Sequence, residues 1–298
     1  MSRLVWILGF LGTAAAYARP YIVGWDDSES FASYAGGTHF DESPGNLEIF
    51  DFGAHVLLSE GLHLTDTITF QPALDFSSTI LRFNDVPTSI LIDKNNLQSF
   101  SVYPSTIEVG GLLCWTRPDT PWMFGAWSRS GLATDFRSID SDDLSIDLAV
   151  GSAYCFSETL SIGVGAAVTD LSGNHRFYPG LGLDWKAADC LQVSLCGNIL
   201  AMNWQPDENW QVSLQTYSAG ENWNIYDDEG RSRDIDLRTY RIGLFVVRRI
   251  LANISVSIGG GITVGNQISL DRTNGDEILE QGLDSGLFGA IRINLAQW

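Results

Sequence analysis

The four histidines, His39, His55, His63 and His175, are the side chains best suited to activate a serine nucleophile at neutral pH. A serine hydrolase site brings a serine, a histidine and an orienting polar group together. His55 precedes Ser59 by four residues, which places the two at separated positions on an extended strand. No Gly-x-Ser-x-Gly elbow occurs. We therefore interpret the histidines as structural or loop residues and expect no enzyme.

Acidic runs and cysteines are the other groups that could hold a ligand. Carboxylate oxygens suit Ca²⁺, but none of the runs has the spacing of a calcium-binding loop, so we interpret them as solvated loops. The cysteine spacings fit neither a CxxC motif nor a zinc ligand set, and packed or free thiols are favoured over disulfides. No metal or cofactor is expected. The residues are Asp26-Asp27-Glu29, Asp140-Asp142-Asp143, Asp227-Asp228-Glu229, Cys114, Cys155, Cys190 and Cys196.

The chain is strongly acidic, with 36 acidic against 17 basic residues and a formal net charge of −19. Its only lysines are Lys94 and Lys186. A negative chain of this kind has no electrostatic attraction to nucleic acid or to an anionic membrane surface. We therefore expect no nucleic-acid partner.

The first residues have the pattern of a secretory signal peptide. Arg3 gives a basic start, residues 4–16 are apolar, and Ala16-Tyr17-Ala18 is a small-x-small cleavage site. The apolar run is too short for a transmembrane helix, which needs roughly 20 residues. We predict a signal peptide over residues 1–18 and export of the rest.

After residue 18 the recurring pattern is an alternation of apolar and polar residues with period two, which is typical of strands with one apolar face. In residues 191–199 the positions Leu191, Val193, Leu195 and Ile199 alternate with Gln, Ser, Cys and Asn. Many such segments reach the roughly 9–11 residues that a tilted transmembrane strand needs. About twelve segments follow the pattern, near 47–58, 62–76, 102–116, 121–131, 143–156, 160–170, 176–186, 190–202, 209–218, 235–248, 251–264 and 284–296.

The connections between these segments alternate between tight and long. Residues 157–159, 187–189 and 249–250 are tight, whereas 135–143, 219–234 and 271–282 are long and acidic. Short turns on one side and longer loops on the other are typical of an up-and-down antiparallel transmembrane β-barrel. We predict an all-β barrel of about 12 strands over residues 47–298, preceded by an irregular N-terminal arm over 19–46.

Alternation does not by itself say which face points outward, since a soluble barrel turns its apolar residues inward and a membrane barrel turns them to lipid. The polar faces are rich in Ser, Thr, Gln, Asn and Gly, which suits a confined aqueous lumen. Aromatic residues near strand ends suit the membrane interfaces. They are Trp115, Trp122, Trp185, Trp204, Trp210, Tyr217 and Tyr240. We predict location in the bacterial outer membrane, with its lipids and the barrel-assembly machinery as partners.

Residues 178–185 (YPGLGLDW), with the alternating strand from Leu191, resemble a bacterial outer-membrane β-barrel family of unknown function. Residues 240–244, together with the Gly259-Gly260-Gly261 strand, fit the same family. The resemblance covers residues 45–298 and rests on structural Gly, Pro and aromatic positions. It implies a barrel fold and no particular activity.

If the apolar faces meet lipid, the polar faces enclose a lumen of mixed charge. Charges that pair across the lumen would close it, whereas charges segregated on opposite walls would leave a polar pore. The candidate lumen-facing residues are His63, Asp75, Glu108, Asp147, Arg176, Asp184, Lys186, Arg241 and Arg292.

We therefore expect a passive small-solute channel or a structural envelope protein. One alternative is an outer-membrane lipid hydrolase or acyltransferase, which requires a histidine beside a serine hydroxyl at a strand end. The other is a secreted soluble barrel that binds an apolar ligand, which requires Leu191 to Ile199 to turn their odd positions inward.

Overall fold

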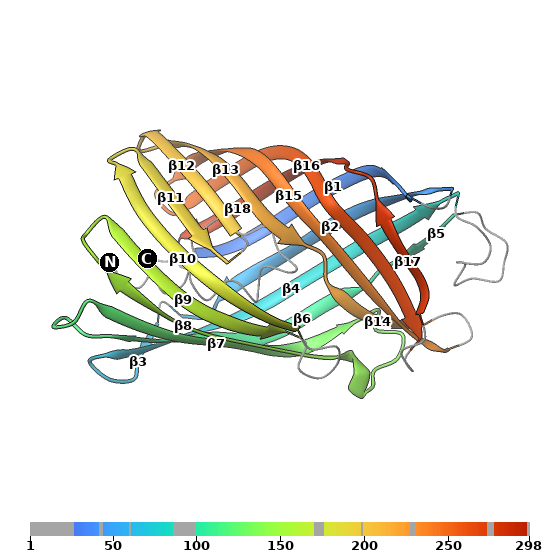
Figure 1. Cartoon of the computed structure of the whole chain (residues 1–298), viewed down its shortest axis with the longest axis horizontal. Helices are drawn as coiled ribbons and strands as arrows, with labels where there is room; N and C mark the ends of the chain where they lie inside the picture. Colours follow the sequence, from blue (N-terminus) through green and yellow to red (C-terminus); the bar gives the residue numbers. More distant parts are fainter. Residues whose placement is uncertain are drawn as a thin grey trace.

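A computed structural model describes residues 27–41, 44–59, 61–85, 99–169, 176–197, 199–226, 230–272 and 277–296, and most of them are strand. The predicted signal peptide and His175 lie outside these residues. Within them, 14 antiparallel strands form one closed ring (Figure 1). The ring runs through β1 (Asp27–His39), β2 (Asn46–Leu57), β4 (Ile68–Asn84), β6 (Ser105–Thr116), β7 (Trp122–Thr134), β8 (Leu144–Cys155), β9 (Leu160–Thr169), β10 (Arg176–Ala188), β11 (Leu191–Cys196), β12 (Ile199–Asp207), β13 (Trp210–Ala219), β15 (Ser232–Leu251), β16 (Ile254–Arg272) and β18 (Leu287–Ala296).

Short elements lie on the connections between the ring strands. They are β3 (Leu62–His63), β5 (Phe100–Val102), β14 (Asn222–Tyr226), β17 (Glu277–Leu283) and a 3₁₀ turn, η2 (Ser141–Asp143). The described residues contain no helix long and apolar enough to cross a membrane. The prediction of an all-β antiparallel barrel is confirmed, and the predicted number of strands was too low.

Strand β1 closes the ring, because it pairs with β2 on one side and with β18 on the other. The prediction of an irregular arm over 19–46 is therefore wrong for residues 27–39. The strand alternates buried Phe31, Ser33 and Ala35 with exposed Ala32 and Tyr34. Its small Ser and Ala residues weaken the contrast between its two faces, so that the alternation is hard to recognise in the sequence.

The segment predicted as one strand over 190–202 forms the two strands β11 and β12. Gly197 has a φ of 59°, a left-handed conformation that glycine adopts without steric cost. The chain reverses there, and Cys196 pairs with Ile199. Ile199 is consequently buried inside the barrel, and the prediction that it shares a face with Leu191 is wrong.

The predicted division into short turns at one end and longer loops at the other holds for most connections. The tight connection predicted at 249–250 is wrong, because these residues lie within β15, and the connection between β11 and β12 is short although it lies at the other end. In an up-and-down ring successive connections lie at opposite ends, and 156–159, 189–190 and 252–253 all lie at one end, called here the short-turn end. The opposite, long-loop end carries 135–143 and 220–231, the latter including β14 (Figure 1).

The outer face of the barrel is apolar. Val150, Val164 and Ile258 are each more than half exposed, whereas the neighbouring Ala149 and Ser257 are buried. Strand β11, whose odd-numbered residues would point inward in the soluble alternative, also turns its apolar residues outward. Leu191, Val193 and Leu195 pair with the exposed Trp204, Met202 and Leu200, so they share the outward face, and Ser194 points inward. The geometry contradicts the soluble alternative.

Exposed aromatic side chains lie on the outer face of the barrel at the short-turn end. Trp122, Trp185, Trp204 and Trp210 are exposed there, and Trp122 packs edge-on against the Tyr154 ring of the next strand. Tyr217 was predicted to share this position, but it is fully buried inside the barrel, because it lies in phase with the inward-facing Gln215.

Candidate functional site

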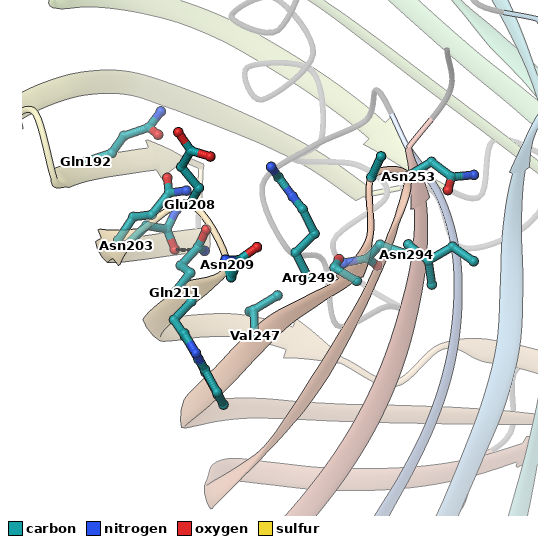
Figure 2. A pocket seen from close by; sticks show the side chains of 14 residues that line it. Gln192, Asn203, Glu208, Asn209, Gln211, Val247, Arg249, Asn253 and Asn294 are labelled. Carbon is teal, nitrogen blue, oxygen red and sulfur yellow. Dashed lines mark hydrogen bonds between the residues drawn. The ribbon is translucent and has the colours of Figure 1, made fainter.

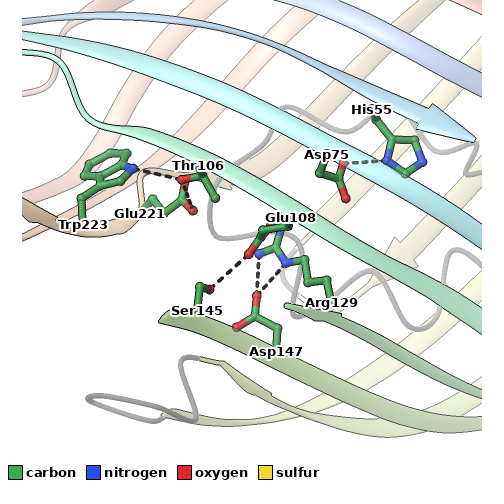
Figure 3. Close-up of polar contacts among 9 residues, drawn as sticks. All are labelled: His55, Asp75, Thr106, Glu108, Arg129, Ser145, Asp147, Glu221 and Trp223. Atoms are coloured by element: carbon green, nitrogen blue, oxygen red, sulfur yellow. Dashed lines mark hydrogen bonds and ion pairs between the residues drawn. The ribbon is translucent and has the colours of Figure 1, made fainter. Parts of the chain in front are cut away.

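One wall of the lumen carries an ion-pair network on three adjacent strands, β6, β7 and β8. Arg129 lies between two buried carboxylates, with its Nη1 2.9 Å from Glu108 Oε2 and its Nη2 2.6 Å from Asp147 Oδ2 (Figure 3). Ser145 donates a further hydrogen bond to Glu108. The guanidinium donates a hydrogen bond to Asp147 and forms an ion pair with Glu108, so both buried carboxylates lie beside a positive charge.

The network continues onto β4 and β2. Asp75 lies opposite Glu108 in the strand register, and its Oδ1 is 2.7 Å from Nδ1 of the buried His55 (Figure 3). Asp75, Glu108, Asp147 and Arg129 together are called the acidic wall, since these adjacent strands carry three carboxylates and one guanidinium.

A second cluster, on β13, β15 and β18, is basic. Arg241 Nη2 lies 2.7 Å from Asp51 Oδ2, and Arg241 Nη1 donates to Ser33 Oγ at 2.8 Å. Asp51 is on β2, four strands away from β15 around the ring, so this ion pair crosses part of the lumen. The guanidinium also lies over the Phe288 ring.

Arg292, the other arginine of this basic cluster, is fully buried and stacks over the Phe245 ring at 4.2 Å. Its Nη1 donates to Gln215 Oε1 at 3.0 Å, and its Nε and Nη2 have no hydrogen-bond partner in the described part of the chain. Within the described residues no carboxylate lies within ion-pair distance of it. The basic cluster therefore holds two guanidinium groups against one carboxylate.

An apolar plug fills the long-loop end of the lumen. It contains 20 buried side chains, among them Leu47, Leu81, Ile235 and Ile268, nearly all from nine of the ring strands and from β14 and β17. Side chains from opposite walls meet here, so the described part of the lumen is closed at this level.

Strand β14 folds inward over this plug. The Trp223 indole donates to Thr106 Oγ1 on β6 at 3.2 Å, and Thr106 donates to Glu221 Oε1 at 2.7 Å (Figure 3). The backbone of Asn224 pairs with Thr134 of β7. These contacts hold the 220–231 connection against the wall on which β6 and β7 lie.

The same connection is fastened to the 135–143 loop by Tyr226, whose hydroxyl donates to Asp140 Oδ2 at 2.5 Å. This hydrogen bond lowers the pKa of Asp140 below its ordinary value of 3.8. Burial, followed by the hydrogen bond to Asp140, raises the pKa of Tyr226 to about 12. Burial raises the pKa of the nearby Asp143.

The structure places most of the predicted lumen residues inside, in separate groups. Asp75, Glu108 and Asp147 form the acidic wall, and Arg241 and Arg292 form the basic cluster. Asp184 accepts hydrogen bonds from Gln192 and Ser194, apart from both groups. His63 lies on the lumen side opposite Thr69 but is exposed at the short-turn rim, and Lys186 is paired with Asp189 at the same rim. The side chain of Arg176 lies outside the described residues.

Sequence reasoning missed the residues that organise these groups, which are Asp51, His55 and Arg129. A signal for two of them was available, because Asp51 and His55 are in phase with Gly53 while Phe50 and Phe52 occupy the opposite face. Their pairing with residues distant in the chain left no such signal.

The described residues show no histidine hydrogen bonded to a serine hydroxyl. His55 contacts Asp75, and His63 Nδ1 lies 3.4 Å from Thr69 Oγ1. The four cysteines, all among the described residues, form no disulfide, and Cys114 and Cys196 are buried.

Comparison with known proteins agrees with the resemblance to a barrel family of unknown function. A family model described as a domain of unknown function (DUF6268) matches residues 116–295, from the end of β6 to β18. The chain belongs to this family. No curated protein matches it.

Solved structures that resemble the chain include outer-membrane proteins. An outer membrane channel from Pseudomonas putida F1 is 10% identical with a TM-score of 0.41, covering 94% of this chain and 98% of its own. The toluene transporter TodX of P. putida is 8% identical with a TM-score of 0.41, covering 91% and 89%. The transport unit of the Escherichia coli autotransporter AIDA-I is 10% identical with a TM-score of 0.33, covering 91% and 89%. Such low TM-scores carry no information about what this chain does.

Removing one partner of the Arg241–Asp51 pair should leave the other charge buried in the lumen without its counter-charge. We expect Arg241→Met to lower the free energy of unfolding by about 3–5 kcal/mol, as for other broken buried pairs. Replacing both partners, in Arg241→Met with Asp51→Leu, should recover part of this loss, because no charge is left unpaired. Denaturant unfolding of the refolded barrel in detergent measures each variant.

Arg292→Met is the matched control, since Arg292 hydrogen bonds to an amide and should lose less stability than Arg241. Strictly additive effects of the Arg241 and Asp51 substitutions would contradict the assigned pairing.

The Tyr226–Asp140 contact should give a defined dependence on pH. The folded-state pKa of Asp140 is depressed, so the contact stabilises fully above the ordinary pKa of 3.8 and loses its effect as pH falls through the depressed pKa. We expect Tyr226→Phe to be less stable than the wild type at about pH 7, and this difference to shrink at about pH 2.5.

Unfolding midpoints of both proteins at the two pH values measure the difference. Tyr240→Phe, which alters a tyrosine on the outer face, should differ from the wild type equally at both. A difference for Tyr226→Phe that stays constant with pH would argue against the contact.

Proposed function

We propose that the chain is an integral outer-membrane β-barrel that passes small polar solutes, with its lumen closed at the long-loop end in the conformation described. The observation that carries the proposal is the inversion of the barrel, in which apolar side chains cover the outside and polar or charged ones line the inside. Lipid is the environment in which such an exterior is stable.

Two further features support a membrane location. The apolar exterior runs around the ring, whereas soluble monomers rarely expose apolar patches above a few hundred Å². The exposed tryptophans at the short-turn end have the position of an interfacial aromatic girdle. With the predicted signal peptide, these features support export, insertion by the barrel-assembly machinery and contact with outer-membrane lipids. The short-turn end would face the periplasm.

The distribution of charge supports a solute path rather than a uniformly neutralised core. The acidic wall lies on β4 to β8, and the two arginines of the basic cluster lie on β15 and β18, on a different part of the ring. The Arg241–Asp51 pair spans part of the lumen. The acidic wall and Arg292 lie on separate parts of the ring, and segregated charges of this kind line a polar path whose selectivity they set. Movement of β14 away from Thr106 would be the step that admits solute through the long-loop end.

A structural role in the envelope is the second candidate, and the apolar plug favours it. Twenty buried side chains close the long-loop end. A barrel that never opens there would serve as an anchor or scaffold.

Membrane insertion predicts that an arginine on the outer face is costly in proportion to its depth. Val164→Arg, in the middle of β9, should destabilise the barrel in lipid by about 2–4 kcal/mol. Ile250→Arg, on the outer face beside the short-turn end, should cost about 0–1 kcal/mol. Folding titrations in lipid vesicles measure the stability of both variants. Equal losses of stability at the two positions would contradict an exterior that is embedded in lipid.

Occlusion by β14 predicts a gain of conductance when its anchor is removed. Trp223→Ala deletes the indole that binds Thr106 and should convert a closed barrel into one with stable single-channel steps in a planar bilayer. Trp204→Ala, which removes an exposed girdle tryptophan, is the matched control and should stay as closed as the wild type. Silence of the folded, inserted Trp223→Ala barrel would exclude the proposed path and favour the structural role.

A further inference from the structure

A polar recess of about 250 Å³ opens on the inner side of the short-turn end, away from the apolar plug. Strands β11, β12, β13, β15, β16 and β18 contribute to it, together with the turns at 208–209 and 252–253. Figure 2 shows side chains from these separate strands converging on one space.

The lining of the recess is dominated by side-chain amides. Seven of its fourteen residues are Asn or Gln, and each amide offers both hydrogen-bond donors and an acceptor. The only charged lining residues are one acid, Glu208, and one base, Arg249, so the recess has no excess charge. The amides are Gln192, Asn203, Gln205, Asn209, Gln211, Asn253 and Asn294.

Some of these amides hold one another in place. Gln211 Nε2 donates to Asn203 Oδ1 at 3.1 Å, and Ser213 Oγ donates to the same oxygen. Gln192 is held by Asp184 in the same way. Each contact uses one polar atom of the amide and fixes the orientation of the side chain. The second polar atom of the same amide is therefore held in a fixed direction as well.

Asn294 presents a buried hydrogen-bond acceptor at the recess. It lines the recess, is 8% exposed, and its Oδ1 has no hydrogen-bond donor among the described residues. A buried acceptor without a donor is costly, and a bound group with a hydroxyl or N–H would satisfy it.

We propose that this recess binds a neutral, polyhydroxylated solute of the size of a mono- or disaccharide. Hydroxyl groups donate and accept at once, as the amides do, so a sugar would pair with both kinds of atom in the lining. An apolar ligand would bury the amides without partners, and an ion would meet no excess of opposite charge. The inference names a solute class for the proposed path and in that respect rests on the proposed function.

Binding is tested on the full barrel, refolded in detergent, by saturation-transfer NMR and calorimetric titration with glucose and maltose. We expect saturable binding of at least one of the two, and much weaker binding of glucose 6-phosphate and of cyclohexanol. Gln211→Leu should weaken sugar binding about tenfold, because a polar group of the ligand would lose its partner. Asn294→Leu should have a similar effect.

Gln71→Leu is the matched control, since Gln71 is a lumen amide on β4 that does not line the recess, and it should bind sugar as the wild type does. Gln211 is only partly buried, so its variant remains informative if Asn294→Leu does not fold. Absence of saturable sugar binding, equal binding of the phosphorylated sugar, or equal losses in Gln71→Leu would overturn the inference.

Conductance and equilibrium binding separate this inference from the proposed function. If the Trp223→Ala barrel conducts while no sugar binds, the sugar-binding inference is wrong and the channel proposal stands. If sugar binding depends on Gln211 but the Trp223→Ala barrel does not conduct, the sugar-binding inference stands and the channel proposal is wrong.

Discussion

Closure of the strand ring by β1 is the constraint on which the rest of this structure depends. Every ring strand has a neighbour on both sides only because Asp27–His39 pairs with both β2 and β18. Without it, two long strands would expose unpaired N–H and C=O groups, which neither lipid nor a dry lumen can satisfy. Once the ring is closed, strict alternation sends each side chain either outward to the apolar face or inward to the lumen.

The inward side chains then divide the lumen into layers with different properties. Most charges lie on the walls in ion-paired groups, which lowers the cost of burying them. Arg292 is instead held by the Gln215 amide and the Phe245 ring. The apolar plug and β14 close the long-loop end, whereas amides surround open volume at the short-turn end. If the proposed function holds, solute would bind from the open short-turn end while the long-loop end is still closed.

Glycines make the interior geometry possible where rings lie on the sheet. A Cβ at Gly259 would lie 2.4 Å from the Phe245 ring, and one at Gly243 would lie 2.7 Å from the Phe288 ring. Both rings support the guanidinium groups of Arg292 and Arg241. The glycine pattern that suggested a barrel family therefore also shapes the site on which the basic cluster rests.

The sequence by itself determined the strand class and which residues of most strands share a face, because the period of two is a local property of the chain. It failed at β1, whose small residues weaken the alternation, and at Gly197, where a turn of two residues lies inside an apparently continuous pattern. Only the tertiary structure decided which lumen charges meet. Arg241 and Asp51 are 190 positions apart, and the Trp223 anchor reaches 117 positions back to Thr106. Such pairs depend on the register and closure of the whole ring, which no local pattern encodes.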